Sequence, residues 1–278
     1  MSVFWLLLAA TVQDAPSDIE KARAEAVKAA AEILGGDPLV EIRATVFVIV
    51  TDGDRETMDR AAGTVTRVSA ALYRQFFAKR AERPLKVFAF SGKTSYDKFV
   101  RATYGKEPTT PYGFYMPSDR SMVMNLATGT GTLAHELVHP LIEEDFAAVP
   151  AWFNEGFASL FEQSSYDEDG SIRGLVNWRL RGLQPALRDG SAPKLEEVLS
   201  TSRSEFYGSG SGLNYAVARY LCLYLQEQGL LAKYYKTFRA KHKDDPSGKA
   251  VLKEVTGKSP AELQEEWAAW ALKLNFER

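Results

Sequence analysis

Two of the three histidines in this chain lie four residues apart, with a glutamate directly after the first. They are His135, Glu136 and His139, in the segment TLAHELVHPL (132–141). Helical residues four apart project from one face a single turn apart, so both imidazoles can bind one metal ion. Zinc takes such nitrogen ligands, and the intervening glutamate is placed to reach a metal-bound water. The motif predicts a zinc site that still needs a third ligand.

Two acidic residues downstream compete to be that ligand. Asp145 lies ten residues after His135, a spacing at which a third ligand can follow HExxH if the chain turns sharply in between. Such a turn normally needs a glycine at the position where this chain has Ile142. Glu155 lies in VPAWFNEGFASLFE (149–162), a predicted second helix that begins near Pro150. The small residues beside Glu155 would let this helix approach the first closely. We therefore expect Glu155 to be the third ligand and Asp145 to be a loop or cap residue.

Three other residues bear on the geometry of this site. Pro140 removes a helical hydrogen bond, so the first helix should bend or stop near it, after both histidines. Ser159, one turn after Glu155, either orients a ligand or is simply a small residue at a helix contact. The third histidine, His242, lies among charged residues and is expected at the surface.

The elements around the motif predict an α+β fold. We expect an α/β part at 17–170, a helical part at 171–278 and a leader at 1–16. The expected α/β elements are a helix at 17–36 capped by Ser17 or Asp18, a strand at 44–52, a helix at 55–80 closed by Pro84, a strand at 84–92, a helix at 96–105 and two short strands at 113–126. Helical periodicity dominates after about residue 172. The strand RSMVMNL (120–126) is either an open edge for an extended peptide or a sheet strand without a ligand role.

Composition narrows the class of protein. The chain has 278 residues, 45% of them hydrophobic, and a net charge of −2 without a basic stripe, which argues against nucleic-acid binding. The single cysteine, Cys222, excludes an internal disulfide framework and a thiolate zinc site, and it is expected to be buried. The apolar run at 3–12 is too short to span a bilayer. It fits a secretory signal, although no Lys or Arg precedes it, so we expect export without excluding a cytoplasmic location.

HELVH followed by PAWFNEGFASLFE resembles the gluzincins and, more narrowly, the bacterial peptidase MA-like domain family. In that family the HExxH helix leads into a P-x-W-x-x-E-G-x-A helix. GFYMPSDRSMVMNLATGTGTLAHE before the motif and NYAVARYLCLYLQEQG after it are similar to further family segments. The likeness covers most of residues 44–275 and is specific over 113–162.

The resemblance implies a fold, a cofactor and residue roles. It implies a thermolysin-like N-terminal lobe with a mixed sheet, an all-helical C-terminal lobe, and one zinc ion between them. The implied residues are the ligands His135, His139 and Glu155, the base Glu136, and Tyr215 as oxyanion donor, with Tyr207 second. The chain departs from the family at Ser159, where no aspartate is present.

These observations predict a zinc-dependent peptidase acting on a peptide or protein substrate. Two alternatives remain open: a peptidase-like zinc-binding or scaffold module that cleaves nothing, and a metal-dependent hydrolase of a non-peptide amide. Retention of Glu136 favours an enzyme, because a purely structural zinc site has no use for a base.

Overall fold

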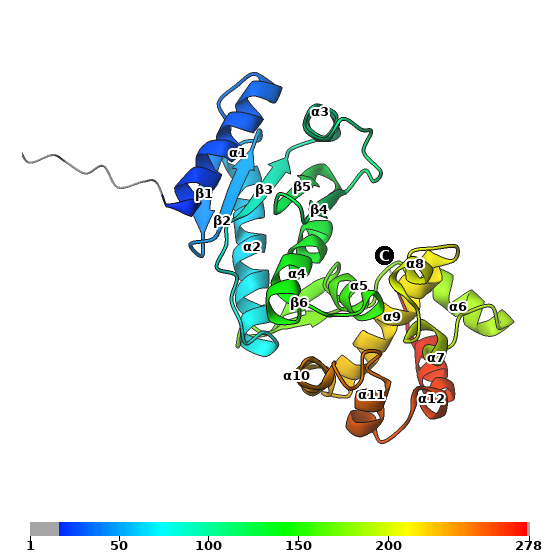
Figure 1. Ribbon diagram of the computed structural model, residues 1–278. Coiled ribbons are helices and arrows are strands. Elements are labelled where there is room, and N and C mark those ends of the chain that lie inside the picture. The colour runs from blue at the N-terminus through cyan, green and yellow to red at the C-terminus, as the bar shows by residue number, and fades with distance from the viewer. Residues whose placement is uncertain (1–16, 277–278) are drawn as a thin grey trace, which may run out of the picture.

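The computed structural model describes residues 17–276 and has an α+β architecture (Figure 1). The predicted leader at 1–16 lies outside the described residues. A five-stranded mixed sheet has the order β1-β2-β3-β5-β4. Its strands are β1 (Leu39–Arg43), β2 (Phe47–Thr51), β3 (Leu85–Phe90), β4 (Gly113–Met116) and β5 (Ser121–Asn125). Strands β2, β3 and β5 run parallel, while β1 and β4 are antiparallel to their neighbours.

Helices make up most of the rest of the chain. Those of the α/β part are α1 (Asp18–Leu34), α2 (Arg55–Gln75), α3 (Lys93–Tyr104), α4 (Gly131–Asp145) and α5 (Ala151–Leu160). A small hairpin of β6 (Ser164–Tyr166) and β7 (Ile172–Gly174) follows. The helices after it are α6 (Leu180–Asp189), α7 (Leu195–Val198), α8 (Arg203–Phe206), α9 (Ser211–Glu227), α10 (Leu231–Lys241), α11 (Lys249–Thr256) and α12 (Pro260–Lys273). None of the helices within 17–276 has both the length and the apolar character needed to cross a bilayer.

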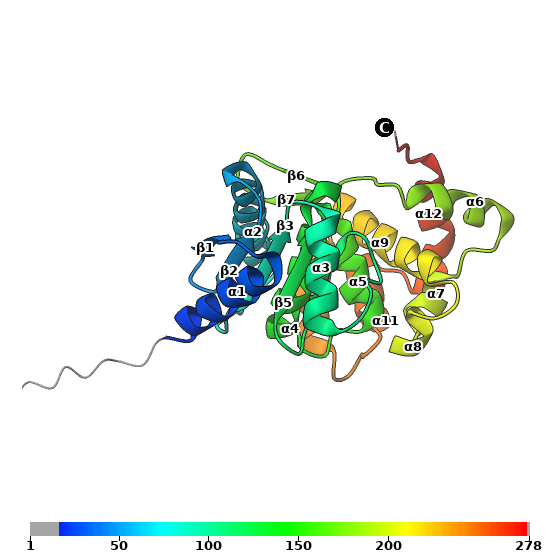
Figure 2. The ribbon, with the colours of Figure 1, turned by 90° about the horizontal axis from the view of Figure 1, so that it is seen from above.

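Both faces of the sheet are covered by helices (Figure 2). Val48 and Val50 of β2 point to one face and pack with α1 and α3. Phe47 and Ile49 point to the other face and join the larger core beneath α2 and α4. This alternation is the period of a strand whose two faces are both buried. It places α4, the helix with the two histidines, against the sheet.

The sequence predicted most of these elements, but it missed the β6–β7 hairpin, whose second strand lies in the part expected to be all-helical, and it differs at three further places. Helix α1 has its N-cap at Ser17 and ends at Gly35, as expected. Strand β1 was missed because the turn into β2 uses Ala44 and Thr45 at positive φ instead of the usual glycine or asparagine. Helix α2 ends at Gln75, well before Pro84, and Asp145 binds the backbone just after it. The helical pattern over 175–188 begins only at Leu180, because the side chain of Asn177 accepts a backbone bond in the preceding turn.

The prediction that RSMVMNL forms an open sheet edge is wrong. This strand is β5, and it is buried between β3 and β4. Strand β4 pairs antiparallel with it and becomes the outermost strand of the sheet. The carbonyl of Tyr112 accepts the N–H of Asn125, so by alternation the backbone groups of Gly113 and Tyr115 point away from β5.

Helix α5 lies between α4 and α9, and a glycine allows the close contact with α9. A Cβ atom at Gly156 would lie 2.8 Å from the backbone carbonyl of Ala218, closer than real contacts allow. Gly156 directly follows Glu155, so the packing of α5 against α9 fixes the depth of the predicted third ligand.

Candidate metal centre

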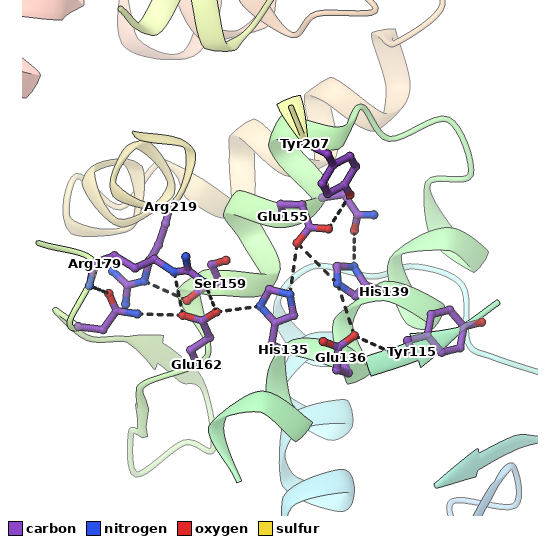
Figure 3. Close-up of polar contacts among 12 residues, drawn as sticks. Tyr115, His135, Glu136, His139, Glu155, Ser159, Glu162, Arg179, Tyr207 and Arg219 are labelled. Atoms are coloured by element: carbon purple, nitrogen blue, oxygen red, sulfur yellow. Dashed lines mark hydrogen bonds and ion pairs between the residues drawn. The ribbon is translucent and has the colours of Figure 1, made fainter. Parts of the chain in front are cut away.

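The three predicted ligands come together at the contact between α4 and α5 (Figure 3). Oε2 of Glu155 lies 3.2 Å from Nε2 of His135 and 3.8 Å from Nε2 of His139. All three side chains are buried. This carboxylate oxygen is shielded from solvent, and among residues 17–276 it accepts no well-aligned hydrogen bond, its near neighbours being the two imidazole nitrogens. A buried acceptor left unsatisfied is costly, which points to an electrophile between these three atoms.

The donor set and its spacing fit zinc. Tetrahedral zinc with bonds of about 2.0–2.1 Å holds its ligand atoms about 3.3 Å apart. The 3.2 Å between Glu155 and His135 matches this value, and the 3.8 Å between Glu155 and His139 is about 0.5 Å longer. Burial alone would raise the pKa of Glu155, but the imidazoles of His139 and His135 outweigh it and hold the pKa well below its usual range. The carboxylate is therefore an anion, the form in which it binds a cation.

Glu136 lies beside the ligands and is held by the edge strand. Its Oε2 is 3.9 Å from Nε2 of His139 and accepts the backbone N–H of Tyr115 at 2.9 Å. One donor atom from each of His135, Glu136 and His139 falls within 4.8 Å of the others. Burial raises the pKa of Glu136. Its carboxylate borders the cleft next to the candidate metal position.

The other ring nitrogen of each histidine faces an oxygen atom of a neighbouring side chain. Nδ1 of His139 lies 3.0 Å from Oδ1 of Asn154, which can only accept, so the proton is on Nδ1 and Nε2 is free to bind a metal. Nδ1 of His135 lies 3.2 Å from Oε1 of Glu162. Burial would lower the pKa of His135, but Glu155 and Glu162 raise it to about 10. Such outer partners orient ligating histidines and make them more basic.

Glu162 is the main residue of the site whose role the sequence did not predict. Its carboxylate accepts Nε and Nη2 of Arg179 at 3.1 and 2.7 Å and Nδ2 of Asn177 at 3.0 Å. Burial opposes its ionisation, but His135 and Arg179 lower the pKa of Glu162 to about 2. A Cβ atom at Gly131 would lie 2.3 Å from the carbonyl oxygen of Glu162. The glycine therefore allows the first turn of α4 to lie directly against the backbone of Glu162. The available signal was the position of Glu162 on the same small and polar face as Glu155.

Ser159 does not orient a ligand. Its Oγ is buried and has no hydrogen-bond partner, while its carbonyl accepts Nε of the buried Arg219 at 2.9 Å. Arg219 also donates to the carbonyl of Leu175. Ser159 therefore serves the packing of α5 against α9, which is the other role expected for it.

Helix α4 continues through Pro140 to Asp145, so of the bend or stop expected near the proline, the stop does not occur. The last turn is anchored by the buried carboxylate of Asp145. Asp145 accepts the N–H groups of Ala78 and Lys79 at 2.9 and 2.8 Å, the hydroxyl of Tyr235 at 2.8 Å and Nη1 of Arg239 at 2.6 Å. These donors occupy both oxygens, so Asp145 is a structural residue and not a ligand.

Changing Asp145 to Asn should destabilise the protein at neutral pH. It would leave Arg239 without its counter-charge, at a cost of about 3 kcal/mol in the free energy of unfolding. Burial would raise the pKa of Asp145, but Arg239 and the other donors lower it from 3.8. The ionised Asp145 carboxylate therefore adds to the free energy of unfolding above pH 3.8, the ordinary pKa of an aspartate. This stabilisation is lost as the pH falls through the lower pKa that Asp145 has in the folded protein. Urea unfolding should show a large gap between wild type and D145N near pH 7 that narrows below pH 3.8; an equal gap at both pH values would contradict this role.

The two candidate tyrosines occupy different places. The hydroxyl of Tyr207 donates to Oε1 of Glu155 at 2.6 Å, on the oxygen that faces away from the histidines. Tyr215 lines the cleft, where its ring packs on Phe206 and lies under the guanidinium of Arg179. Burial and the Glu155 charge raise the pKa of both tyrosines, so both keep their protons at neutral pH.

A cleft of about 850 Å³ opens beside the histidines, between the α/β part and the helical part. Its walls come from the segment before β4, the start of α4, the loop before α6 and the start of α9. The other two sequence candidates lie elsewhere: His242 contacts Phe146, and Cys222 is buried in α9, where burial raises its pKa.

Comparison with known proteins assigns no relationship. No family model matches the chain, and no curated protein has a significantly similar sequence. The assignment of this site therefore depends on its geometry.

Proposed function

We propose that the protein is a zinc-dependent peptidase of the gluzincin type, with a thermolysin-like arrangement of the α/β part and the helical part around one zinc ion. The observation that carries the proposal is the buried Oε2 of Glu155, which faces the Nε2 atoms of both His135 and His139 and, among residues 17–276, accepts no well-aligned hydrogen bond. The proposed ligands are these three residues. Zinc with three protein ligands supplies Lewis-acid activation of a water molecule.

The residues of the chain then have distinct roles. Glu136 accepts the proton of the attacking water and passes it to the leaving amine. Its Oε2 is fixed by the N–H of Tyr115, which keeps it at the cleft next to the ligands. Tyr215 faces the cleft and is proposed to donate to the carbonyl oxygen as negative charge develops on it. The hydroxyl of Tyr207 is engaged by Glu155, so it is proposed to orient that ligand.

The edge strand β4 supports a peptide as substrate. The backbone groups of Gly113 and the carbonyl of Tyr115 point away from β5, while the Tyr115 N–H is donated to Glu136 beside them. An extended peptide that pairs with this edge would lie across the cleft with a peptide bond near Glu136. A small non-peptide amide would make no use of this edge. A scaffold without activity would make no use of a carboxylate held as Glu136 is.

Zinc analysis and a cleavage assay test the proposal. Purified protein should contain about one zinc per chain. It should cleave members of a broad peptide library, lose activity when a chelator removes the zinc, and regain it when zinc is returned. Full zinc content without cleavage of any library member would favour the scaffold alternative, and protein that binds no zinc would overturn the assignment of the site.

Glu162→Gln should weaken zinc binding about 10–100-fold, the usual effect of losing an outer partner. Glutamine keeps the size of the side chain but removes the charge that polarises His135. Chelator competition measures the affinity, and a thermal melt of the zinc-free protein checks folding. Glu168→Gln, an exposed change in the loop between β6 and β7, is the matched control. Equal zinc affinity in E162Q and E168Q would rule out this role.

A further inference from the structure

Four aromatic rings and three threonines contribute to the lining of the cleft beside the metal centre, together with glycine, serine and charged residues. Tyr112 and Phe114 come from the edge-strand side, and Trp178 and Tyr215 come from the helical part. Thr110, Thr128 and Thr132 also line the cleft. The volume of about 850 Å³ falls within the range of roughly 300–1,000 Å³ that is typical of ligand sites.

The cleft offers no free charge to a substrate side chain. Apart from His135 and Glu136, its charged lining residues are Glu162 and Arg179. These two neutralise each other through paired hydrogen bonds of 3.1 and 2.7 Å. A charged side chain entering this space would lose water without gaining a partner. The lining therefore favours an apolar side chain.

Trp178 is the most prominent apolar group on the helical side of the cleft. Its ring is 48% exposed, and Tyr112 across the cleft is 52% exposed. A ligand that covers rings of this size gains binding free energy, because it removes a large apolar area from water and makes specific contacts with the rings.

The backbone on both sides of Trp178 is fixed. Asn177 donates its N–H to the hydroxyl of Tyr220, whose own O–H returns to the Asn177 carbonyl. The side chains of Asn177 and Arg179 both bind Glu162. Trp178 therefore lies between Asn177 and Arg179, whose side chains are both hydrogen-bonded to Glu162. Such preorganisation reduces the entropy lost when a ligand binds.

We propose that Trp178 is a specificity-determining residue, which selects peptides with an aromatic or large aliphatic side chain next to the cleaved bond. This inference rests on the proposed peptidase function and adds the substrate class to it. Trp178 binds the substrate side chain and takes no part in proton transfer.

Kinetics on matched peptides test the selection. The peptides carry Phe, Ala or Ser at one position, on either side of the cleaved bond. Wild type should show a kcat/KM at least about tenfold higher for Phe than for Ser, the range that one apolar contact gives. Trp178→Ala should lower kcat/KM for the Phe peptide about tenfold and change that for the Ala peptide less than about twofold. Tyr166→Ala removes another exposed aromatic residue (38%) outside the cleft and should change neither.

Binding to an inactive variant separates this inference from the proposed function. Glu136→Gln protein, with and without Trp178→Ala, is titrated with the same peptides by calorimetry. Tighter binding of the Phe peptide that disappears with W178A supports the selection even if wild type cleaves nothing, in which case the peptidase function fails alone. Cleavage of all peptides at similar rates, unchanged by W178A, overturns the selection and leaves the peptidase function standing.

Discussion

Glu136→Gln is expected to lower kcat for peptide hydrolysis by about 10²–10⁴-fold, the usual contribution of a positioned general base. Glutamine has nearly the same shape and its amide oxygen can still accept the Tyr115 N–H, so the side chain should stay in place. It cannot take a proton from water. Because Glu136 is not among the proposed ligands, the zinc content should remain at about one per chain.

The measurement pairs steady-state kinetics with metal analysis on the same preparation. Glu168→Gln, on the exposed loop after β6, serves as the control for the same chemical change. Loss of activity together with loss of zinc would mean that Glu136 acts as a ligand. Retained activity in E136Q would remove it from the mechanism.

Glu155→Ala is expected to lose zinc altogether under dialysis that leaves wild type loaded. The change removes the one carboxylate that faces both Nε2 atoms, so the loss of affinity should exceed the 10–100-fold typical of an outer partner. It also leaves the Tyr207 hydroxyl without its acceptor. Activity should fall with zinc content and should not return at moderate zinc concentrations.

A size-matched variant and a control make this result specific. Glu155→Gln keeps a hydrogen-bond acceptor for Tyr207 but is a much weaker ligand, so it should also bind zinc poorly. Glu168→Ala should retain full zinc. A circular dichroism melt of each variant in its zinc-free form excludes simple unfolding. Full zinc content in a folded Glu155→Ala protein would contradict the ligand assignment.

The sequence predicted the part of the site that helical periodicity determines. His135, Glu136 and His139 are related within one helix, so their spacing gives their relative directions. Glu155 could be inferred because it lies on the small and polar face of the next helix. In both cases a local pattern was sufficient.

The outer part of the site could not be predicted in this way. Asn177 and Arg179 lie in the irregular chain before α6, where no period relates one side chain to another. Their contact with Glu162 is set by the packing of that chain against α4 and α9. The position of β5 inside the sheet has the same origin, because strand order depends on long-range pairing and not on the pattern within one strand.

The close packing of Gly156 on α9 has a consequence for any attempt to shorten the protein. A fragment that stopped near residue 170 would still contain every proposed ligand and the base. It would lose the α9 backbone that α5 rests on, the Arg219 side chain that holds the Ser159 carbonyl, and the Arg179 guanidinium that holds Glu162. The smallest unit able to assemble the candidate metal centre therefore extends through α9 to Glu227, although the motif segment ends at residue 162, 65 residues earlier.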